Sequence, residues 1–87
     1  MKIDTNSGKI FVVKFAYEYE SDVPEATNCV VTDPQKTFEA TGRAVCDSRD
    51  EFVKRIGRKI ALKKAVATFP RETRKQIWDG YISQAHV

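Results

Sequence analysis

The sequence is poor in the side chains from which most reactive and metal-binding sites are built. It has one histidine, His86, and two cysteines, Cys29 and Cys46, with neither a C-x-x-C spacing nor a histidine nearby. A structural zinc site needs four such ligands at characteristic spacings, so we expect no metal and no cofactor. General acid–base catalysis needs a well-positioned side chain, whereas His86 belongs to a tail that should fray. Walker, zincin and nucleophile-elbow motifs are missing as well, and we therefore expect no catalytic residues and no enzyme activity.

Long apolar runs are also missing from the chain. No segment approaches the roughly 20 apolar residues that cross a bilayer, and the first residues lack the apolar core of a signal peptide. We therefore expect no membrane partner and a cytoplasmic location. Disulfides are rare in that compartment, which favours two buried, reduced thiols at Cys29 and Cys46.

The length and the charge distribution suit one small domain with a basic surface. The 87 residues, 41% of them apolar, support a single core over residues 1–87. Residues 1–47 carry five Lys and Arg against eight Asp and Glu, a charge of −3. Residues 48–87 carry ten against four, a charge of +6. The basic half suits an acidic or phosphate-rich partner, although solvated side chains and internal ion pairs are the alternative explanation.

Most of the first half of the chain has the pattern of β-strands. Residues 9–20 alternate apolar and polar side chains, with a largely aromatic row on one face, which predicts a strand. A second strand is expected near residues 29–32, after a loop at 21–27. A third is expected at 36–46, where Gly42 indicates a bulge or a close backbone approach. Residues 1–8 are expected to be a flexible lead.

The stretch from Ser48 to Val66 is the strongest helical signal. Ser48 and Glu51 match the S-x-x-E capping box. Apolar residues recur at three- and four-residue steps, which predicts a buried stripe with basic residues on the opposite side. Gly57, at the edge of the stripe, is expected to allow close packing of the helix on the sheet. The predicted stripe consists of Phe52, Val53, Ile56, Ile60 and Ala61.

A second, shorter helix is expected to begin at Pro70, because proline is favoured at the first helical position. Residues 83–87 are expected to form a frayed tail. Together these elements predict an α+β fold. It would be a three-stranded antiparallel sheet packed by one long amphipathic helix, with a short second C-terminal helix.

The basic side of the long helix is the best candidate for a binding site. Guanidinium groups one turn apart on a rigid helix suit bidentate contacts with phosphate or carboxylate. The alternative surface is the acidic sheet edge around Glu18, Glu20 and Asp22. The predicted partner-binding or anion-binding residues are Arg43, Arg49, Arg55, Arg58 and Lys59.

Residues 44–66 resemble a pattern seen in very small bacteriophage proteins. A strand ends in a small residue and Cys, an Asp and a Phe follow, and a Gly-Arg pair precedes Ile-Ala. The resemblance is to accessory anti-defence proteins, such as anti-CRISPR proteins or the Thoeris anti-defence sponges that sequester immune signals. It implies an inhibitor that acts in the host-cell cytoplasm. The residues that carry it are Cys46, Asp50, Phe52, Gly57, Arg58, Ile60 and Ala61.

Two main functions compete on this basis. The first is a non-enzymatic, phage-type inhibitor that binds and blocks a bacterial immune component through the basic helix face. Its partner would be a host defence protein, a nucleoprotein complex such as a CRISPR effector, or a cyclic-nucleotide signal. The alternative is a nucleic-acid-binding module that docks its basic helix on phosphates, and a structural protein of a virion is a third reading. The acidic half would repel phosphate, which favours the inhibitor; an oligomer is left open.

Overall fold

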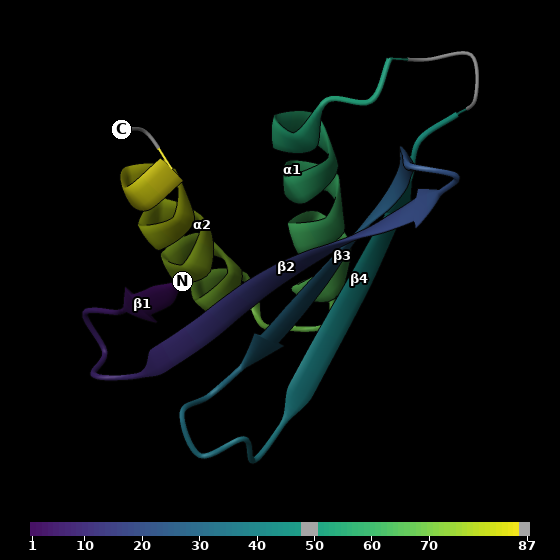
Figure 1. The fold of residues 1–87 in the computed structure, drawn as a ribbon. Coiled ribbons are helices and arrows are strands. Elements are labelled where there is room, and N and C mark those ends of the chain that lie inside the picture. The colour runs from purple at the N-terminus through teal and green to yellow at the C-terminus, as the bar shows by residue number, and fades with distance from the viewer. Residues whose placement is uncertain (48–50, 86–87) are drawn as a thin grey trace.

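Within residues 1–47 and 51–85, which the computed structural model describes, four strands and two helices follow one another along the chain (Figure 1). The strands form one antiparallel sheet in the order β1-β2-β3-β4. The expected α+β class is confirmed, but the sheet has one strand more than predicted. The elements are β1 Lys2–Asp4, β2 Ile10–Glu20, β3 Val23–Thr32, β4 Glu39–Val45, α1 Lys54–Ala65 and α2 Arg71–Ala85.

The additional strand is β1, which lies in the segment that was expected to be a flexible lead. It pairs with β2, and the side chain of Ile3 is fully buried. The N-terminal ammonium donates a hydrogen bond of 2.8 Å to the Val13 carbonyl oxygen. Gly8, with a φ of 82°, lets the chain turn back between β1 and β2. A strand of three residues is too short for an alternating pattern to show, which explains the wrong prediction.

The loop expected over residues 21–27 is instead a tight hairpin. Ser21 and Asp22 both adopt left-handed backbone conformations, with φ values of 49° and 69°. Two such residues in succession make a turn whose twist matches that of the flanking strands. As a result β3 begins at Val23 and pairs with β2 over most of its length, with a bulge between Glu18 and Tyr19.

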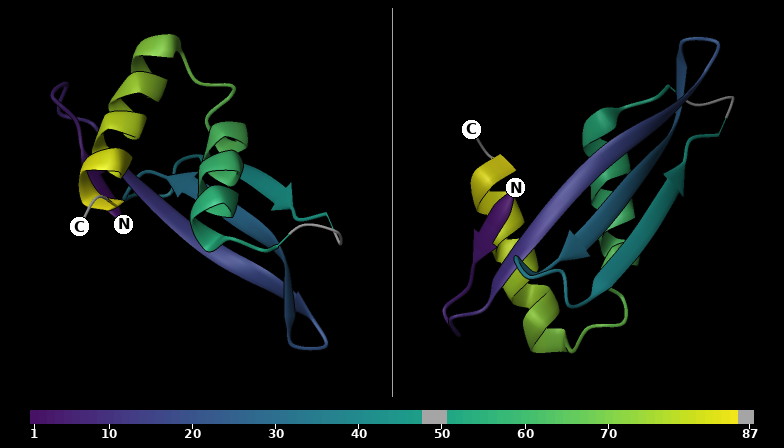
Figure 2. Two further views of the ribbon diagram at one scale, coloured as in Figure 1. Left: turned by 90° about the horizontal axis from the view of Figure 1, so that it is seen from above. Right: turned by 60° about the horizontal axis from the view of Figure 1, so that its bottom comes forward.

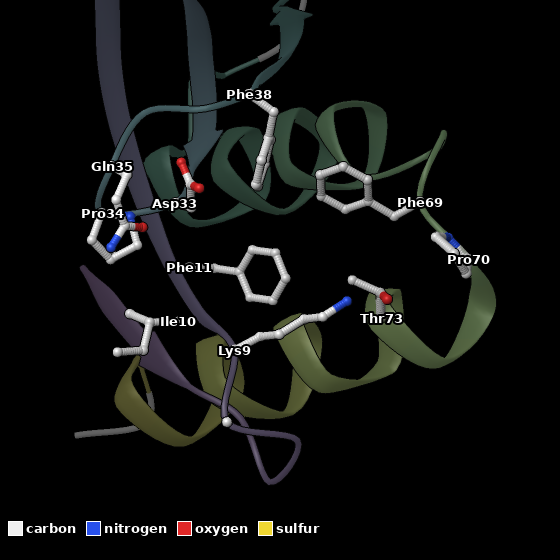
Figure 3. Close-up of a pocket in the computed structure, with 11 residues that line it drawn as sticks. Lys9, Ile10, Phe11, Asp33, Pro34, Gln35, Phe38, Phe69, Pro70 and Thr73 are labelled. Atoms are coloured by element: carbon white, nitrogen blue, oxygen red, sulfur yellow. The ribbon is translucent and has the colours of Figure 1, made fainter.

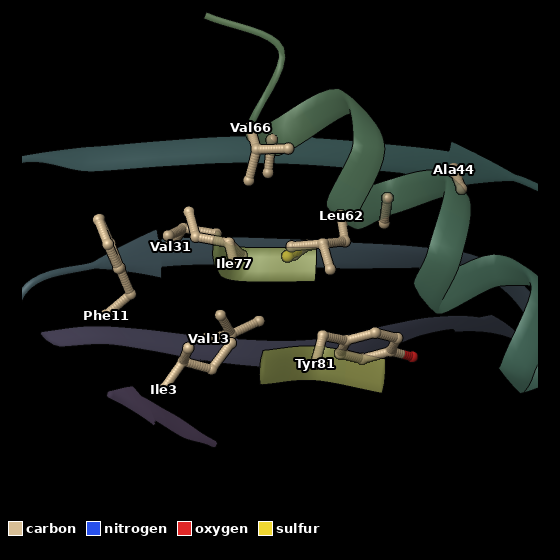
Figure 4. Packing of buried hydrophobic residues seen from close by; sticks show 12 residues of the cluster. Ile3, Phe11, Val13, Val31, Ala44, Leu62, Val66, Ile77 and Tyr81 are labelled. Carbon is tan, nitrogen blue, oxygen red and sulfur yellow. The ribbon is translucent and has the colours of Figure 1, made fainter. Parts of the chain in front are cut away.

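Both helices lie on the same face of the sheet (Figure 2). α1 packs across β3 and β4, and α2 runs beside β1. Tyr81 of α2 also meets Phe15 of β2 edge-on, with ring centroids 5.8 Å apart. Between the helices and the sheet, aliphatic and aromatic side chains from all six elements form one core (Figure 4). Its largest fully buried side chains include Tyr81, Ile3, Leu62 and Ile77.

α1 starts later than the sequence predicted and buries a different face. Residues 51–53 are not helical, and Val53 precedes the first turn without a side-chain cap. Ser48 of the predicted capping box lies outside the described residues. The buried residues of α1 are Ala61, Leu62 and Ala65. Most of the predicted stripe is therefore wrong, because Val53, Ile56 and Ile60 are exposed to 36%, 51% and 43%.

Close contact between α1 and β4 explains this choice of face. Gly42 lies directly beneath the helix, and a Cβ atom there would overlap the Ala61 carbonyl oxygen and the Ala65 amide nitrogen. Only small side chains fit between two backbones at that separation. A Cβ atom on Gly57 would likewise press on the Thr27 side chain. Of the two alternatives predicted at Gly42, a bulge or a close approach, the close approach is confirmed, as is the close packing predicted at Gly57. These contacts select the alanine-rich face of α1 for burial.

α2 begins at Arg71, one residue after the predicted start at Pro70, and continues further than expected. Its helix includes residues 83–85 of the segment that was expected to fray, whereas residues 86–87 lie outside the described part. Trp78 packs at the edge of the core against Tyr81, with ring centroids 5.8 Å apart. The Gln84 side-chain amide donates to the Lys2 carbonyl oxygen at 2.6 Å, which ties the last turns of α2 to β1.

Candidate partner-binding surface

Half of the exposed large hydrophobic side chains in the described part of the chain gather at one place. They line a groove between β4 and the first turns of α1, with a volume of about 260 Å³. A large apolar side chain that stays in water forgoes the free energy of burial, and a group of them marks an interaction surface. These four residues, which we call the apolar ridge, are Val45, Val53, Ile56 and Ile60.

Three exposed cations run along α1 beside the apolar ridge. Arg55, Lys59 and Lys63 are all exposed and follow one another at four-residue steps. Residues four apart in a helix lie one above the other on the same side. They therefore form a cation ridge parallel to Ile56 and Ile60, and the outer face of α1 presents aliphatic and positive side chains together.

β4 is an edge strand of the sheet beside this surface, since within the described residues it pairs only with β3. An unpaired edge offers backbone hydrogen-bonding groups to any extended chain. Here the Lys64 ammonium donates a hydrogen bond of 3.0 Å to the Arg43 carbonyl oxygen. That lysine occupies one acceptor of the edge, which favours contact through the side chains of the outer face over addition of a further strand.

Arg58 points to the inner side of α1. Its guanidinium donates to the Tyr17 hydroxyl oxygen at 3.0 Å, and the side chain is half-buried. The hydrogen bond to Tyr17, followed by that to Tyr81, raises the pKa of Arg58 above its ordinary value. The ammonium of Lys54 also lies 4.8 Å from the centroid of the Tyr17 ring, within the range of a cation–π contact. These two cations hold the first turns of α1 on β2.

Arg43 lies on the opposite face of the sheet. Its guanidinium makes two hydrogen bonds to the Glu18 carboxylate, at 2.6 and 3.0 Å, and Asn28 donates to the same carboxylate at 2.8 Å. The Arg43 bonds, followed by that of Asn28, lower the pKa of Glu18 from 4.5 to about 2. Glu18 of the alternative acidic edge therefore forms an intramolecular ion pair on the surface, while Glu20 and Asp22 stay exposed near the hairpin tip.

The structure therefore divides the predicted site residues. It brings Arg55 and Lys59 together on the outer face of α1, directs Arg58 towards Tyr17, and places Arg43 across the sheet. Arg49 lies outside the described residues. Sequence reasoning assigned the isoleucines of the outer face to the core. The 55-59-63 spacing of the cations was visible in the sequence and indicates a solvent-facing strip, but it does not decide between the isoleucines on one side of it and the alanines on the other.

Comparison of the chain with protein-family models, with curated proteins and with solved structures finds no match. Neither of the two helices in the described part is long and apolar enough to span a membrane. The function must therefore be inferred from the surface of the chain itself.

Proposed function

We propose that the chain is a non-enzymatic inhibitor that binds and blocks a bacterial immune component through the outer face of α1. One observation carries the proposal: the exposed isoleucines of the apolar ridge lie beside the cation ridge of Arg55, Lys59 and Lys63. The anti-defence context comes from the resemblance of residues 44–66 to small bacteriophage proteins. An inhibitor of this kind would act in the cytoplasm of the host cell.

The composition of the surface favours a protein partner. Protein interfaces combine an apolar centre with a polar, charged rim, and here the cation ridge borders the apolar ridge along one side. Phosphate groups are bound by cations and hydrogen-bond donors, so exposed Ile56 and Ile60 would not contribute to such binding. A typical interface buries about 800 Å² on each partner, which is roughly an eighth of the 6145 Å² that the chain exposes. We therefore expect a host defence protein, such as a CRISPR effector, with acidic groups around an apolar patch.

A bacterial infection assay tests the inhibitor directly. Bacteria that carry a defined defence system would produce the chain and then be challenged with a phage which that system restricts. Restored plaque formation is the expected result, and Ile56→Asp/Ile60→Asp should abolish it because charge would replace the apolar centre. Restoration by this variant at the parent level would contradict the proposed surface. Failure of the parent chain across a panel of such systems would contradict the function.

The contribution of the cation ridge is tested with two triple variants that make the same change in net charge. Arg55→Glu/Lys59→Glu/Lys63→Glu should weaken inhibition strongly, because glutamates would repel an acidic rim. The control is Lys2→Glu/Lys14→Glu/Lys75→Glu, which makes the same change in net charge at exposed positions on β1, β2 and α2. The control should inhibit as the parent does. Equal loss in both triple variants would show that only overall charge matters.

The second candidate, a nucleic-acid-binding module, is favoured by the one-turn spacing of the three cations. Salt dependence separates it from the first. Three phosphate contacts should give a slope of log affinity against log salt of about −2.7, nearly independent of sequence. A protein interface with an apolar centre should respond to salt mainly in its association rate. Titration of labelled duplex DNA or RNA at several salt concentrations provides the measurement.

A further inference from the structure

Three connections of the fold meet at an end of the molecule that the proposed inhibitor surface does not use. The β1–β2 turn, the β3–β4 turn and the segment between α1 and α2 line an open cavity of about 510 Å³ (Figure 3). Sites for small molecules commonly have volumes of about 300–1,000 Å³. The cavity, which we call the aromatic cavity, shares no lining residue with the groove beside β4.

Three phenylalanines form its wall. The rings of Phe11, Phe38 and Phe69 contact one another in a triangle, with centroids 5.7 to 6.1 Å apart. Each ring comes from a different part of the chain, and Phe11 is buried while the other two are half-buried. Mutual edge-on and tilted contacts of this kind hold rings in place. The wall is thus preformed and offers aromatic surface to a flat ring.

Two charged residues, Lys9 and Asp33, also line the cavity. The Asp33 carboxylate accepts hydrogen bonds from the Thr37 amide, at 2.7 Å, and from the Thr37 hydroxyl. These bonds lower the pKa of Asp33 and engage both of its oxygens in the β3–β4 turn. Lys9 is exposed, and its side chain extends across the opening towards Thr73 (Figure 3). The Asp33 carboxylate is thus occupied by Thr37, and the charged group most accessible to a ligand is the Lys9 ammonium.

We propose that the aromatic cavity binds a small aromatic anion, such as an aryl carboxylate. The ring packs against Phe11, Phe38 and Phe69, and the anionic group meets the Lys9 ammonium, with the Thr73 hydroxyl as an additional donor. Apolar walls supply most of the affinity, and the single cation at the opening sets the preference for charge. This site is independent of the inhibitor function, so either proposal can fail alone.

Three naphthalene derivatives that differ mainly in charge provide the test. They are 1-naphthoate, which is an anion, the neutral 1-naphthalenemethanol and the cationic 1-naphthylmethylammonium. Binding is followed by NMR shifts of the full chain, which also locate the probe. For ligands of this size we expect a dissociation constant of about 1 mM or tighter for naphthoate. The neutral probe should bind roughly threefold to tenfold more weakly and the cation more weakly still.

Lys9→Met keeps the length of the side chain and removes its charge. It should bring the affinity for naphthoate down to that for the neutral probe, while Lys9→Glu should make the cationic probe the tightest of the three. Lys14→Met, on the open face of the sheet, is the matched control and should change nothing. Since Lys9 and Lys14 are both exposed, these variants should fold as the parent does.

Other results would overturn the proposal. Absence of saturable binding, or shifts centred away from the three phenylalanines, would show that the cavity is not a site. If the cationic probe bound the parent chain most tightly, Asp33 rather than Lys9 would set the charge preference of the cavity. Unchanged naphthoate affinity in Lys9→Met would remove the proposed role of the ammonium.

Discussion

The inner and outer faces of α1 differ in a way that hydrophobicity alone does not explain. The inner face contains the small residues Gly57, Ala61 and Ala65, whereas the outer face exposes the large Ile56 and Ile60. Ala61 and Ala65 are small because the helix backbone there lies almost against Gly42 of β4, and Gly57 lies against Thr27 of β3. The isoleucines have no packing partner of that kind within the described residues. The small inner residues therefore let α1 pack close to the sheet, and its larger aliphatic residues remain available to a partner.

The largest contrast between inside and outside should be seen in thiol reactivity. Cys29 lies in the core on β3, and its burial raises the pKa of its thiol to about 12, whereas Cys46 is half-buried beside the groove. The thiolate is the reactive form. Cys29 should therefore react at least about a thousandfold more slowly than Cys46, at a rate set by unfolding. Mass spectrometry of timed labelling measures both sites. Similar rates would mean that the core opens easily.

The next largest effect should come from truncation of the inner face. Leu62 is fully buried between the helices and the sheet. Leu62→Ala should lower the free energy of unfolding by about 2–5 kcal/mol, since it removes apolar contacts and leaves a cavity. The midpoint of urea unfolding measures the change. A loss below about 1 kcal/mol would show that α1 does not bury this face.

An added methyl group should be nearly as harmful where α1 and β4 touch. Gly42→Ala places a Cβ atom against the backbone of Ala61 and Ala65, which cannot move without shifting the helix. We expect a loss of about 1–3 kcal/mol, the range for overpacking. The same urea titration measures it. An unchanged or raised midpoint would contradict the close approach that explains the buried face.

The outer face should be insensitive to truncation. Ile56→Ala and Ile60→Ala should each lower stability by no more than about 1 kcal/mol, because only about half of each residue is buried. This expectation is the reverse of the one that follows from the predicted stripe. A loss of about 2 kcal/mol or more in the free energy of unfolding of Ile56→Ala would show that Ile56 belongs to the core. Circular dichroism would show that both variants keep their helices.

The smallest effect is expected on the open face of the sheet, and only in acid. Glu18 has a pKa lowered from 4.5 to about 2 by Arg43 and Asn28. A depressed folded-state pKa means that the ion pair contributes stability above about pH 4.5, and that this contribution is lost as the pH falls to about 2. Glu18→Gln should therefore flatten the acid dependence of the urea midpoint. An identical pH profile in the variant would show that the pair contributes nothing.

The sequence predicted much of the fold and little of the site. Alternation over residues 9–20 located β2, and Pro70 located the start of α2. Gly42 and Gly57 were expected to mark close approaches, and both do. β1 and the tight turn at Ser21 escaped notice, because three residues carry no periodicity and non-glycine residues seldom adopt a positive φ. The cation ridge was partly recognised, whereas the aromatic cavity depends on three distant segments that no local pattern brings together.

By itself, the sequence determined the α+β class, the long strand β2 and the two helical regions, and where small residues permit close packing. Those properties are local, since they follow from side-chain spacing and backbone preference. Only the tertiary structure decided which side of α1 is buried. Along the helix, Ile56 with Ile60 and Ala61 with Leu62 and Ala65 are both reasonable core faces. The choice depends on Gly42, nineteen positions before Ala61, because its missing side chain lets the helix backbone approach β4 so closely that isoleucine no longer fits beneath it.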